Sequence, residues 1–250
     1  MDIQWIISPE DVAQVITLIE RQSKNALVRA RREHNLAKSK PPVTRERFWQ
    51  AMVSMRLTTR QKSGPESFVA RLIREKPFPL GYKTVLGARH PETFIAKALR
   101  AAGGIRFADK IASELSQNFS LLETSEWAPT LEQCNRLTRL VPRDVEIEVA
   151  EHVQKHFLGF GPKQSRNVLQ SLWLTRYEIP IDSRLTDWLN EFGFPVCLSA
   201  GALGDDNYYR FVSDGIQMLC ERSGVLPCIF DAAVFALRDS ADWTDENVIF

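Results

Sequence analysis

Lys163 and Asp182 stand 19 residues apart, at the two ends of the stretch KQSRNVLQSLWLTRYEIPID. A lysine amine that is held partly unprotonated is a nucleophile, whereas a charged lysine binds phosphate. A carboxylate can stabilise developing positive charge or take a proton from an attacking group. Asp182 also stands directly before SRLTDWL, where an aspartate often caps a helix. These roles are compatible, because a capping carboxylate has a second oxygen that can face a cleft.

A glycine-rich turn stands immediately before Lys163. The preceding segment, VEIEVAEHVQKHF, repeats apolar residues at the four-residue spacing of one helix face. The turn itself is LGFGP, and an apolar helical run follows it. We therefore expect a helix-hairpin-helix at about residues 145–173. Gly159 and Gly161 permit backbone conformations and close approaches that side chains would block.

Such a turn is a binding site for a phosphate oxygen. Free backbone N–H groups at the turn and at the start of the second helix point outward, and the helix dipole reinforces the attraction. This contact holds a DNA duplex without reading its sequence. A bare Gly-x-Gly before a helix is also compatible with a plain turn between two helices. Lys163, two residues after Gly161, and the apolar run behind it favour DNA binding.

The composition is that of an ordinary globular protein. The chain has 250 residues, enough for one large domain or two small lobes, with 44% hydrophobic and 25% charged residues. No apolar run approaches the roughly 20 residues that a membrane span needs, and the N-terminus does not resemble a signal peptide. We therefore expect a cytoplasmic protein. The cysteines have the spacing of neither zinc knuckles nor a four-cysteine cluster, so we expect buried free thiols at Cys134, Cys197, Cys220 and Cys228.

Opposite charges are segregated along the chain. Residues 21–62 contain twelve arginines or lysines and two glutamates, whereas acidic residues dominate from Asp187 onward. A basic segment of this kind is typical of a surface that binds a polyanion. It is equally compatible with solvated helix faces, and charge alone does not decide between the two.

Nearly every segment has the pattern of a helix. Ser8 followed by Pro9 is a typical helix start, Thr44 can cap RERFWQAMVSM, and Asp144 can cap VEIEVAEHVQKHF. Alternating strand patterns are nearly absent, and the best candidate, YEIPI, is too short to form a sheet. The sequence therefore predicts an all-α fold.

The motifs FLGFGPK and IPID, at this spacing, resemble the helix-hairpin-helix, Gly-Pro-Asp superfamily of DNA base-excision glycosylases. That superfamily includes endonuclease III and the 8-oxoguanine, adenine and alkylpurine glycosylases. The specific match covers residues 145–190. The resemblance implies that Asp182 is the catalytic aspartate. It also implies that Lys163 is the lysine that makes some members glycosylase and lyase at once.

The resemblance further implies an architecture and a partner. Two helical lobes flank a cleft for DNA and an extruded base. Residues 45–180 form one lobe, and residues 1–44 and 181–250 form the other. A monomer that binds double-stranded DNA, with no membrane, is expected. The DNA contacts fall on the hairpin and on the helix end that fills the gap left by the base: Gly159, Phe160, Gly161, Lys163, Ser165, Arg56, Leu57 and Thr58.

Three features depart from the family pattern. No four-cysteine loop follows, so no iron–sulfur cluster, no metal and no other cofactor is expected, and only a monovalent cation at the hairpin is left open. Ser165 replaces the usual alanine of the hairpin motif. Arg56, Leu57 and Thr58 stand where the family commonly has glutamine or asparagine, which leaves the identity of the base undecided.

Aromatic residues near the C-terminus are candidates for a base pocket, because aromatic rings can sandwich a base. They are Phe230, Phe235, Tyr208 and Tyr209. Aromatic residues at helical spacing are more often part of the core, so both roles stay open for each of them.

The expected activity is excision of a modified base from DNA. Cleavage of the N-glycosidic bond builds positive charge on the sugar, which Asp182 stabilises. If Lys163 is neutral, it attacks C1′ and nicks the strand through a Schiff base; if it is charged, water is the nucleophile. The base is a hypermodified base of phage DNA, in an antiviral role, or alternatively 8-oxoguanine or another damaged base. A non-catalytic DNA-binding module is the third interpretation, and the spacing of Asp182 argues against it.

Overall fold

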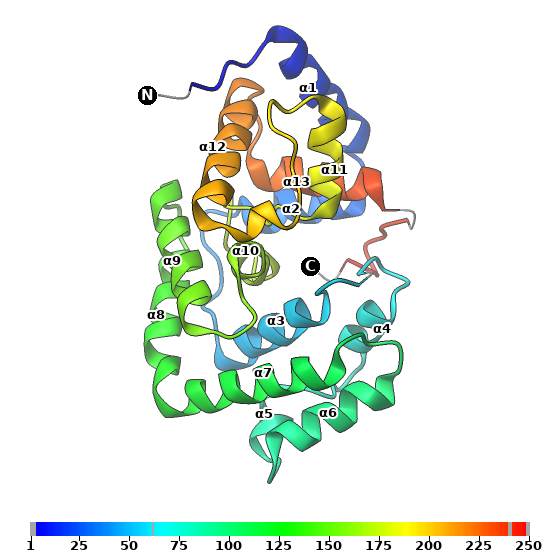
Figure 1. Cartoon of the computed structure of the whole chain (residues 1–250), viewed down its shortest axis with the longest axis vertical. Coiled ribbons are helices and arrows are strands. Elements are labelled where there is room, and N and C mark those ends of the chain that lie inside the picture. The colour runs from blue at the N-terminus through cyan, green and yellow to red at the C-terminus, as the bar shows by residue number, and fades with distance from the viewer. Residues whose placement is uncertain (1–3, 62, 240–241, 249–250) are drawn as a thin grey trace.

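A computed structural model describes residues 4–61, 63–239 and 242–248, and Figure 1 shows its helices. The regular elements within these residues are all helical, which confirms the predicted all-α fold. The α-helices are α1 (Pro9–Gln22), α2 (Ala26–Asn35), α3 (Arg45–Leu57), α4 (Phe68–Arg74), α5 (Tyr82–Leu86), α6 (Pro91–Ala102), α7 (Ala108–Leu121), α8 (Trp127–Arg136), α9 (Arg143–His156), α10 (Pro162–Ser171), α11 (Ser183–Phe192), α12 (Asp206–Arg222) and α13 (Pro227–Arg238). A π-helical segment, η1 (Leu122–Glu126), joins α7 to α8, and a short 3-10 helix, η2 (Ala202–Gly204), precedes α12.

Side-chain caps explain why several helices begin where they do. The hydroxyl groups of Ser8 and Thr44 each accept a hydrogen bond from the backbone N–H three residues later, at the starts of α1 and α3, as predicted. Asp144 does not cap α9, because that helix begins one residue earlier, at Arg143, after Pro142. Asp144 instead lies in the first turn, where the helix dipole favours a negative charge.

Two hydrophobic clusters form the core. The larger cluster consists of buried residues within 43–174 and lies in the lower part of Figure 1. The smaller cluster combines residues within 15–28 with residues within 179–243, so it joins α1 and α2 to α11, α12 and α13 in the upper part. The chain passes from one cluster to the other between α10 and α11, in the segment that leads to Asp182.

Helix α10 lies between the two clusters (Figure 1). It packs against α3 and α9, and its buried residues Val168 and Leu169 belong to the larger cluster. On its other side, Gln170 Nε2 donates a hydrogen bond of 2.7 Å to Asp231 Oδ2 of α13. Because α10 also carries Lys163, this lysine stands where the two halves of the molecule meet.

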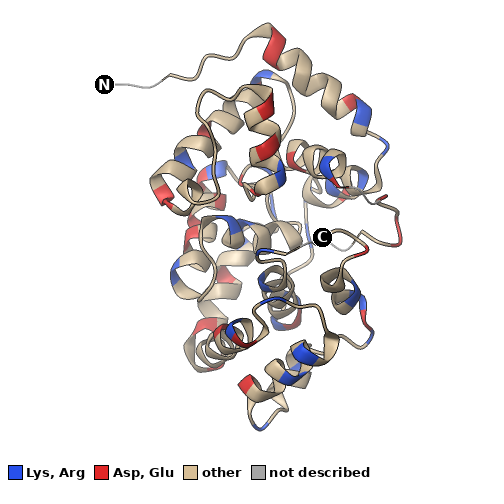
Figure 2. Ribbon diagram, turned by 45° about the vertical axis from the view of Figure 1, so that its right-hand side comes forward, with Lys and Arg blue, Asp and Glu red and all other residues tan. Residues whose placement is uncertain are grey.

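The basic segment of residues 21–62 does not form one exposed surface. Figure 2 shows that arginines and lysines are distributed over several helices, with acidic residues among them. Within this segment, Arg31, Lys40 and Arg56 are buried. Lys40 Nζ donates a hydrogen bond of 3.1 Å to Leu174 O, and burial lowers the pKa of Lys40 to about 8. Lys40 and Arg56 therefore support the fold, while Arg31 borders the cavity described below.

The cysteines are free thiols, and the structure corrects one expectation about them. Cys134, Cys220 and Cys228 are buried as predicted, and burial raises the pKa of each thiol. Cys197 is exposed, because the loop after α11 turns it away from the core. A thiol at that position is accessible to reagents.

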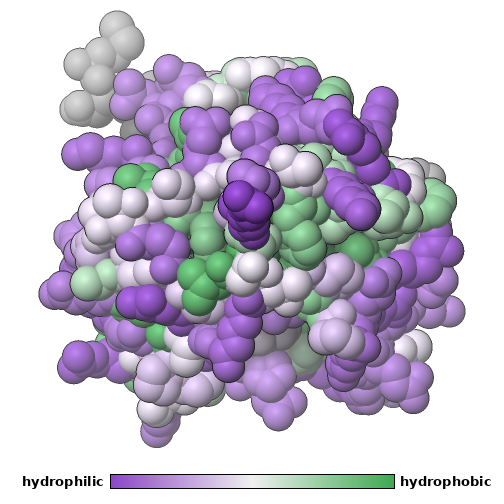
Figure 3. Space-filling view, turned by 90° about the horizontal axis from the view of Figure 1, so that it is seen from below, coloured by the Kyte–Doolittle hydropathy of each residue, from purple (hydrophilic) through white to green (hydrophobic). Residues whose placement is uncertain are grey.

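The end of the molecule that carries α5, α6 and α7 has a largely polar surface, with hydrophobic side chains near the middle of the face shown in Figure 3. Exposed large hydrophobic residues on these elements include Leu86, at the end of α5, and Phe107, just before α7. Scattered apolar residues of this kind are normal on a globular surface. In the part of the chain that the structure describes, no helix combines the length and the apolar character needed to cross a membrane.

Candidate active site

The turn between α9 and α10 is held by side chains from α7 and α3. Asn118 of α7 binds both backbone groups of Leu158: its Oδ1 accepts a 2.8 Å hydrogen bond from the N–H, and its Nδ2 donates a 3.0 Å bond to the carbonyl. Gly159 has a φ of 82°, and a Cβ there would lie 2.5 Å from Nε of Arg56. Both the backbone conformation and the lack of space therefore require glycine at this position.

Gly161 differs from Gly159 in its surroundings. A Cβ at Gly161 would meet no atom of the described residues within 4 Å, and its backbone is extended, with a φ of −79°. It directly precedes the first turn of α10, whose N–H groups have no partner inside the helix. Because no described residue fills the space in front of this helix start, a ligand such as a phosphate group has room there.

Two of the predicted DNA contacts are buried inside the hairpin. Phe160 is 2% exposed and belongs to the larger cluster. Ser165 is fully buried, and its hydroxyl donates a 2.9 Å hydrogen bond to Pro162 O. These residues hold the hairpin from within, because the turn folds them back onto α3. Their side chains are therefore not at the surface, and the DNA contacts predicted at these two positions stay predictions that would use the backbone.

The end of α3 is also more buried than predicted. Leu57 is fully buried, and Arg56 is 4% exposed and forms an ion pair with Glu114 of α7. Of the three residues predicted there to contact DNA, Thr58 borders the cavity described next. The loop that follows α3 also borders this cavity, through Arg60, so the surface available to a ligand lies beyond the helix end.

A cavity of about 500 Å³ lies beside the hairpin. Lys163, from the first turn of α10, and Asp182, directly before α11, both line it. Further lining residues come from α2, from the loop after α3 and from α13, so both halves of the molecule contribute. The tertiary structure thus brings together the lysine and the aspartate that the sequence singled out.

Asp182 caps α11 and faces the cavity at the same time. Its Oδ1 accepts a 3.0 Å hydrogen bond from Leu185 N, which satisfies one N–H group of the first turn of the helix. Its Oδ2 lies 3.3 Å from Nη1 of Arg184. One oxygen therefore fixes the orientation of the carboxylate, and the other is presented beside an arginine at the cavity wall.

Lys163 is partly buried, and this burial is the main cause that lowers the pKa of its amine. Asp182 opposes the shift, because a nearby negative charge favours the protonated amine, and Asp231 acts in the same direction. Arg184 adds to the lowering. A lowered pKa increases the fraction of neutral amine, which is the form that can act as a nucleophile.

The extended segment that leads to Asp182 is held by a buried carboxylate. Glu146 of α9 accepts hydrogen bonds of 2.8 Å from the backbone N–H groups of Arg176, Tyr177 and Glu178. Burial raises the pKa of Glu146 to about 7, while the three N–H groups favour the ionised form. Glu178 is itself paired at 2.8 Å with Nε of Arg166 on α10. The hairpin and the segment before Asp182 are thereby fixed to each other.

Tyr209 has a positioning role that the sequence did not indicate. Its hydroxyl donates a 2.8 Å hydrogen bond to Ile179 O and accepts a 2.9 Å bond from Ile181 N. The ring is 1% exposed and does not line the cavity beside Lys163. Tyr209 therefore supports the chain immediately before Asp182. Its predicted place in a base pocket stays a prediction.

The other aromatic candidates differ in their placement. Phe235 lines the cavity, and the guanidinium carbon of Arg184 lies 4.0 Å from the centre of its ring. Phe230 is fully buried in the smaller cluster, and Tyr208 packs partly exposed against that cluster. Neither of these two lines the cavity, because successive turns of α12 and α13 direct them into the core. Trp243, which sequence analysis missed, does line it.

Sequence analysis also missed a group of buried polar residues at the cavity. Asp231 of α13 accepts a hydrogen bond from Gln170, and burial raises the pKa of its carboxyl to about 7. Arg31 of α2 donates a 3.2 Å hydrogen bond to Gln170 O, and burial lowers the pKa of its guanidinium. The isolated Asp231 within the apolar segment PCIFDAAVFALR was the available signal, because a carboxylate in such a helix needs a partner or a function.

Two solved structures are similar to this chain over most of its length. The 8-oxoguanine DNA glycosylase of Thermotoga maritima is 16% identical, with a TM-score of 0.66, and the match covers 93% of this chain and 100% of that one. The 8-oxoguanine DNA glycosylase of Methanocaldococcus jannaschii is 15% identical, with a TM-score of 0.68, and the match covers 93% and 95%. This chain has the helix-hairpin-helix glycosylase fold. No protein-family model and no curated protein matches its sequence.

The helix-hairpin-helix glycosylase fold accounts for the arrangement of the site. Its hairpin is formed by α9 and α10, and Asp182 follows α10 at the start of α11. The cavity between them is bordered by both hydrophobic halves. The predicted fold is therefore confirmed.

Proposed function

We propose that this protein is a DNA glycosylase that extrudes a modified nucleotide and cleaves its N-glycosidic bond, leaving an abasic site. The observation that carries the proposal is the presence of Lys163 and Asp182 on one cavity, beside a hairpin whose outer glycine, Gly161, is open to a ligand. The helix-hairpin-helix glycosylase fold supports the same reaction.

The hairpin holds the DNA backbone in this proposal. A phosphate group binds in front of α10, where free N–H groups and the helix dipole attract it. Arg60 and Arg106 are exposed at the edge of the cavity and add positive charge for neighbouring phosphates. Their loops are tied together, because Arg106 N donates a 2.9 Å hydrogen bond to Gln61 Oε1 and Arg106 Nη1 donates a 3.2 Å bond to Arg60 O. These loops, instead of Arg56 and Leu57, fill the gap left by the extruded nucleotide.

Asp182 provides the electrostatic contribution to bond cleavage. Its carboxylate is fixed by the hydrogen bond to Leu185 N, so it needs no reorganisation when positive charge develops on the sugar. The departing base takes up a proton as the N-glycosidic bond breaks. The same carboxylate can orient the nucleophile or accept its proton.

Lys163 is the proposed nucleophile, and its action adds an AP-lyase step. The neutral amine forms a bond to C1′ while the bond from C1′ to the base breaks, and loss of a proton and opening of the sugar ring give a Schiff base. Elimination then breaks the bond between C3′ and its phosphate oxygen. Burial favours the neutral amine at Lys163, which supports this route over attack by water.

The proposed substrate is a base that is larger than the normal ones. A cavity of about 500 Å³ is in the range of pockets that hold drug-sized ligands. Polar side chains of Arg31, Gln170 and Asp231 line it, so hydrogen-bonding groups stand at the wall beside a bound base. These features support a hypermodified base of phage DNA and an antiviral role. The alternative substrate is 8-oxoguanine or another damaged base, which the two similar structures favour.

A panel of substrates tests the proposal and separates the two substrate classes. The protein is incubated with duplexes that carry 8-oxoguanine, alkylated purines or uracil, and with phage DNAs that carry hypermodified bases, and any released base is identified by mass spectrometry. Release that is lost in Asp182→Asn supports the glycosylase. Tight DNA binding without release from any of these DNAs would favour the non-catalytic module, in which the cavity serves only recognition.

One chain supplies the hairpin and every lining residue of the cavity, so we propose that a monomer acts on double-stranded DNA in the cytoplasm. The reaction written above uses only side chains, the DNA and water, so no cofactor takes part in it. A monovalent cation at the carbonyl groups of the hairpin turn would assist phosphate binding without entering the chemistry.

A further inference from the structure

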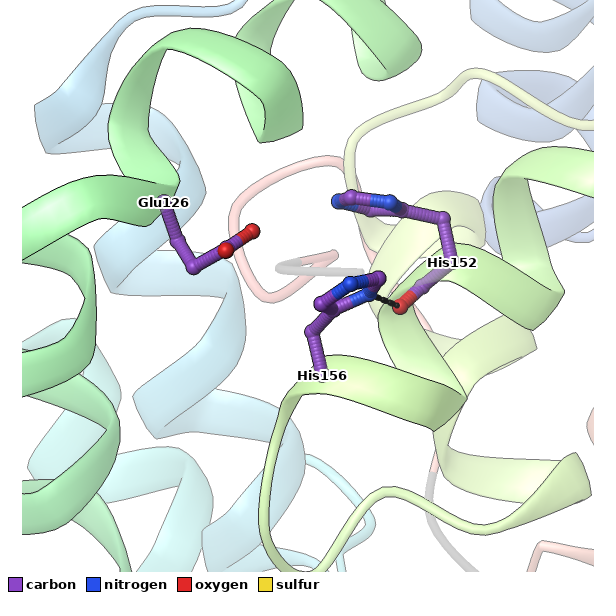
Figure 4. Close-up of side chains that lie close together, drawn as sticks. All are labelled: Glu126, His152 and His156. Atoms are coloured by element: carbon purple, nitrogen blue, oxygen red, sulfur yellow. Dashed lines mark hydrogen bonds between the residues drawn. The ribbon is translucent and has the colours of Figure 1, made fainter.

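Three side chains that could bind a metal meet on the far side of the hairpin from the cavity. Glu126, His152 and His156 each offer one ligand atom, and these atoms all lie within 4.8 Å of one another. Figure 4 shows the two imidazole rings side by side, with the carboxylate of Glu126 directed toward them. None of the three lines the cavity beside Lys163. The sequence analysis predicted no metal site, so this group is new.

The backbone that carries these residues explains why they meet. His152 and His156 are separated by one helical turn of α9, so both rings leave the same face, and their centres lie 4.3 Å apart. Glu126 is the last residue of η1, the π-helical segment between α7 and α8. The extra residue in a π-helical turn changes the direction of the side chains that follow, and such segments occur frequently at functional sites.

The hydrogen bonds leave lone pairs available for a metal ion. His156 Nδ1 lies 2.8 Å from His152 O, and because a carbonyl oxygen can only accept, Nδ1 carries the proton and Nε2 is free to act as a ligand. Binding of the second ring nitrogen to a carbonyl is the usual arrangement around a metal-bound histidine. Glu126 Oε2 is buried without a hydrogen-bond partner, which is costly for a carboxylate that has no other role.

His152 has one contact that a metal would replace. His152 Nε2 is engaged at 3.1 Å with Thr130 Oγ1, which must turn away if this nitrogen binds a metal. Without a metal, the cluster is a pair of partly buried histidines held by Thr130.

We propose that Glu126, His152 and His156 form a binding site for a divalent transition metal, with Zn²⁺ as the best match. Two imidazole nitrogens and one carboxylate are a common zinc ligand set, and water completes the tetrahedron. Ligands at about 2.0–2.1 Å from zinc lie about 3.3 Å from each other, so small rotations of the side chains close the site. The metal joins the start of α8 to the end of α9, directly before the hairpin, and stiffens the element that the proposed function uses for DNA.

A zinc titration on the full-length chain tests this proposal without any need for enzymatic activity. Cys197→Ser serves as the background, because it removes the exposed thiol that would also bind zinc. Metal-stripped protein competes with a chromophoric chelator for Zn²⁺, and we expect one equivalent to be bound. The same stoichiometry is expected for His90→Gln, the matched control, since His90 is exposed and lies outside the cluster.

Variants of the cluster supply the decisive comparison. His152→Gln and His156→Gln should lose the bound equivalent, and Glu126→Gln, which keeps the size of the side chain, should bind Zn²⁺ at least about 10-fold more weakly. Zn²⁺ should raise the melting temperature of the background and of His90→Gln but not of the histidine variants. If a histidine variant fails to fold, Glu126→Gln alone decides. The proposal is overturned if the background binds no Zn²⁺, or if all variants bind it equally. Either result leaves the glycosylase proposal untouched.

Discussion

The two walls of the cavity differ in how far apart their residues lie in the sequence. The hairpin wall carries Lys163 and Asp182, which belong to the consecutive elements α10 and α11. A second wall combines Arg31 of α2 with Asp231 and Phe235 of α13, and Arg31 and Asp231 are 200 residues apart in the chain. The first wall has local causes, a glycine turn and a helix cap, whereas the second exists only because α13 packs against α2.

The two walls also differ in their electrostatics. Lys163 and Asp182 both line the cavity, and the negative charge of Asp182 favours the protonated amine. On the other wall, burial dominates: it lowers the pKa of Arg31 and raises that of Asp231. Asp231, a buried acid whose pKa is raised, recognises a ligand by hydrogen bonds, while the carboxylate of Asp182 acts on developing charge. The comparison assigns chemistry to the hairpin wall and recognition to the other.

The largest effect is expected at Asp182. Asp182→Asn should keep the helix cap, because asparagine is an equally good capping residue, but it removes the negative charge. We expect single-turnover base release to fall at least about 100-fold, with DNA affinity largely retained. Asp187→Asn on the same helix, at an exposed position, is the matched control and should be neutral. Equal rates in both variants would remove Asp182 from the mechanism.

Lys163 is the next test of the hairpin wall. With wild-type protein and an excised substrate, borohydride should trap a covalent protein–DNA adduct, and Lys163→Gln should abolish both trapping and strand nicking. Lys97→Gln on α6, at an exposed position outside the cavity, should leave both unchanged. If the wild-type protein releases the base but yields no adduct, water is the nucleophile and Lys163 binds phosphate.

The two hairpin glycines should respond in opposite ways. Gly159→Ala forces a side chain into a positive φ and against Arg56, so we expect the free energy of unfolding to fall by about 1–3 kcal/mol. Gly161→Val should change it by less than about 0.5 kcal/mol, because the position is open. The valine should instead weaken binding to every DNA sequence alike, with a lower salt dependence of affinity. Urea denaturation and titrations of labelled duplexes measure the two effects, and a loss confined to one lesion would contradict phosphate binding.

The smallest effect concerns the recognition wall. Because burial raises the pKa of Asp231 to about 7, the folded protein binds this proton more tightly than the unfolded chain does. The stabilisation that results is complete below about pH 4 and is lost as the pH rises through about 7. Asp231→Asn has no such proton, so its stability relative to wild type should increase between pH 5 and pH 7.5. Glu146 titrates in both proteins and cancels in this comparison.

Urea denaturation at the two pH values measures that difference, at about 1.4 kcal/mol for each pH unit over which the folded protein keeps the proton and the unfolded chain does not. Asp187→Asn again provides the control, since its exposed carboxylate should give a difference that does not change with pH. If the difference in unfolding free energy between Asp231→Asn and wild type is also the same at both pH values, Asp231 is ionised throughout, held by Arg31.

Several residues that were predicted to contact DNA have buried side chains for one physical reason. Arg56, Leu57, Phe160 and Ser165 lie on the predicted segments, but their side chains turn into the protein. Whether a side chain faces a ligand or a neighbouring helix depends on what packs against it. Glu114 and Asn118 of α7, which bind Arg56 and the hairpin turn, are far from them in the sequence. The HVQKH spacing of His152 and His156 was visible, but the third member of that group comes from another helix.

The sequence by itself determined the elements that rest on short-range physics. Helical periodicity, capping residues and the glycine turn specified the all-α fold, the hairpin and the cap at Asp182, because each depends on neighbours within a few residues. The tertiary structure decided which side chains line the cavity and how their pKa values shift. Burial and long-range packing determine both the lining and the pKa shifts, and the local spacing of residues in the sequence does not indicate burial or packing of this kind. For that reason Lys163 and Asp182 could be found in the sequence, whereas the meeting of Arg31, Gln170 and Asp231 at the cavity depends on how α2, α10 and α13 pack.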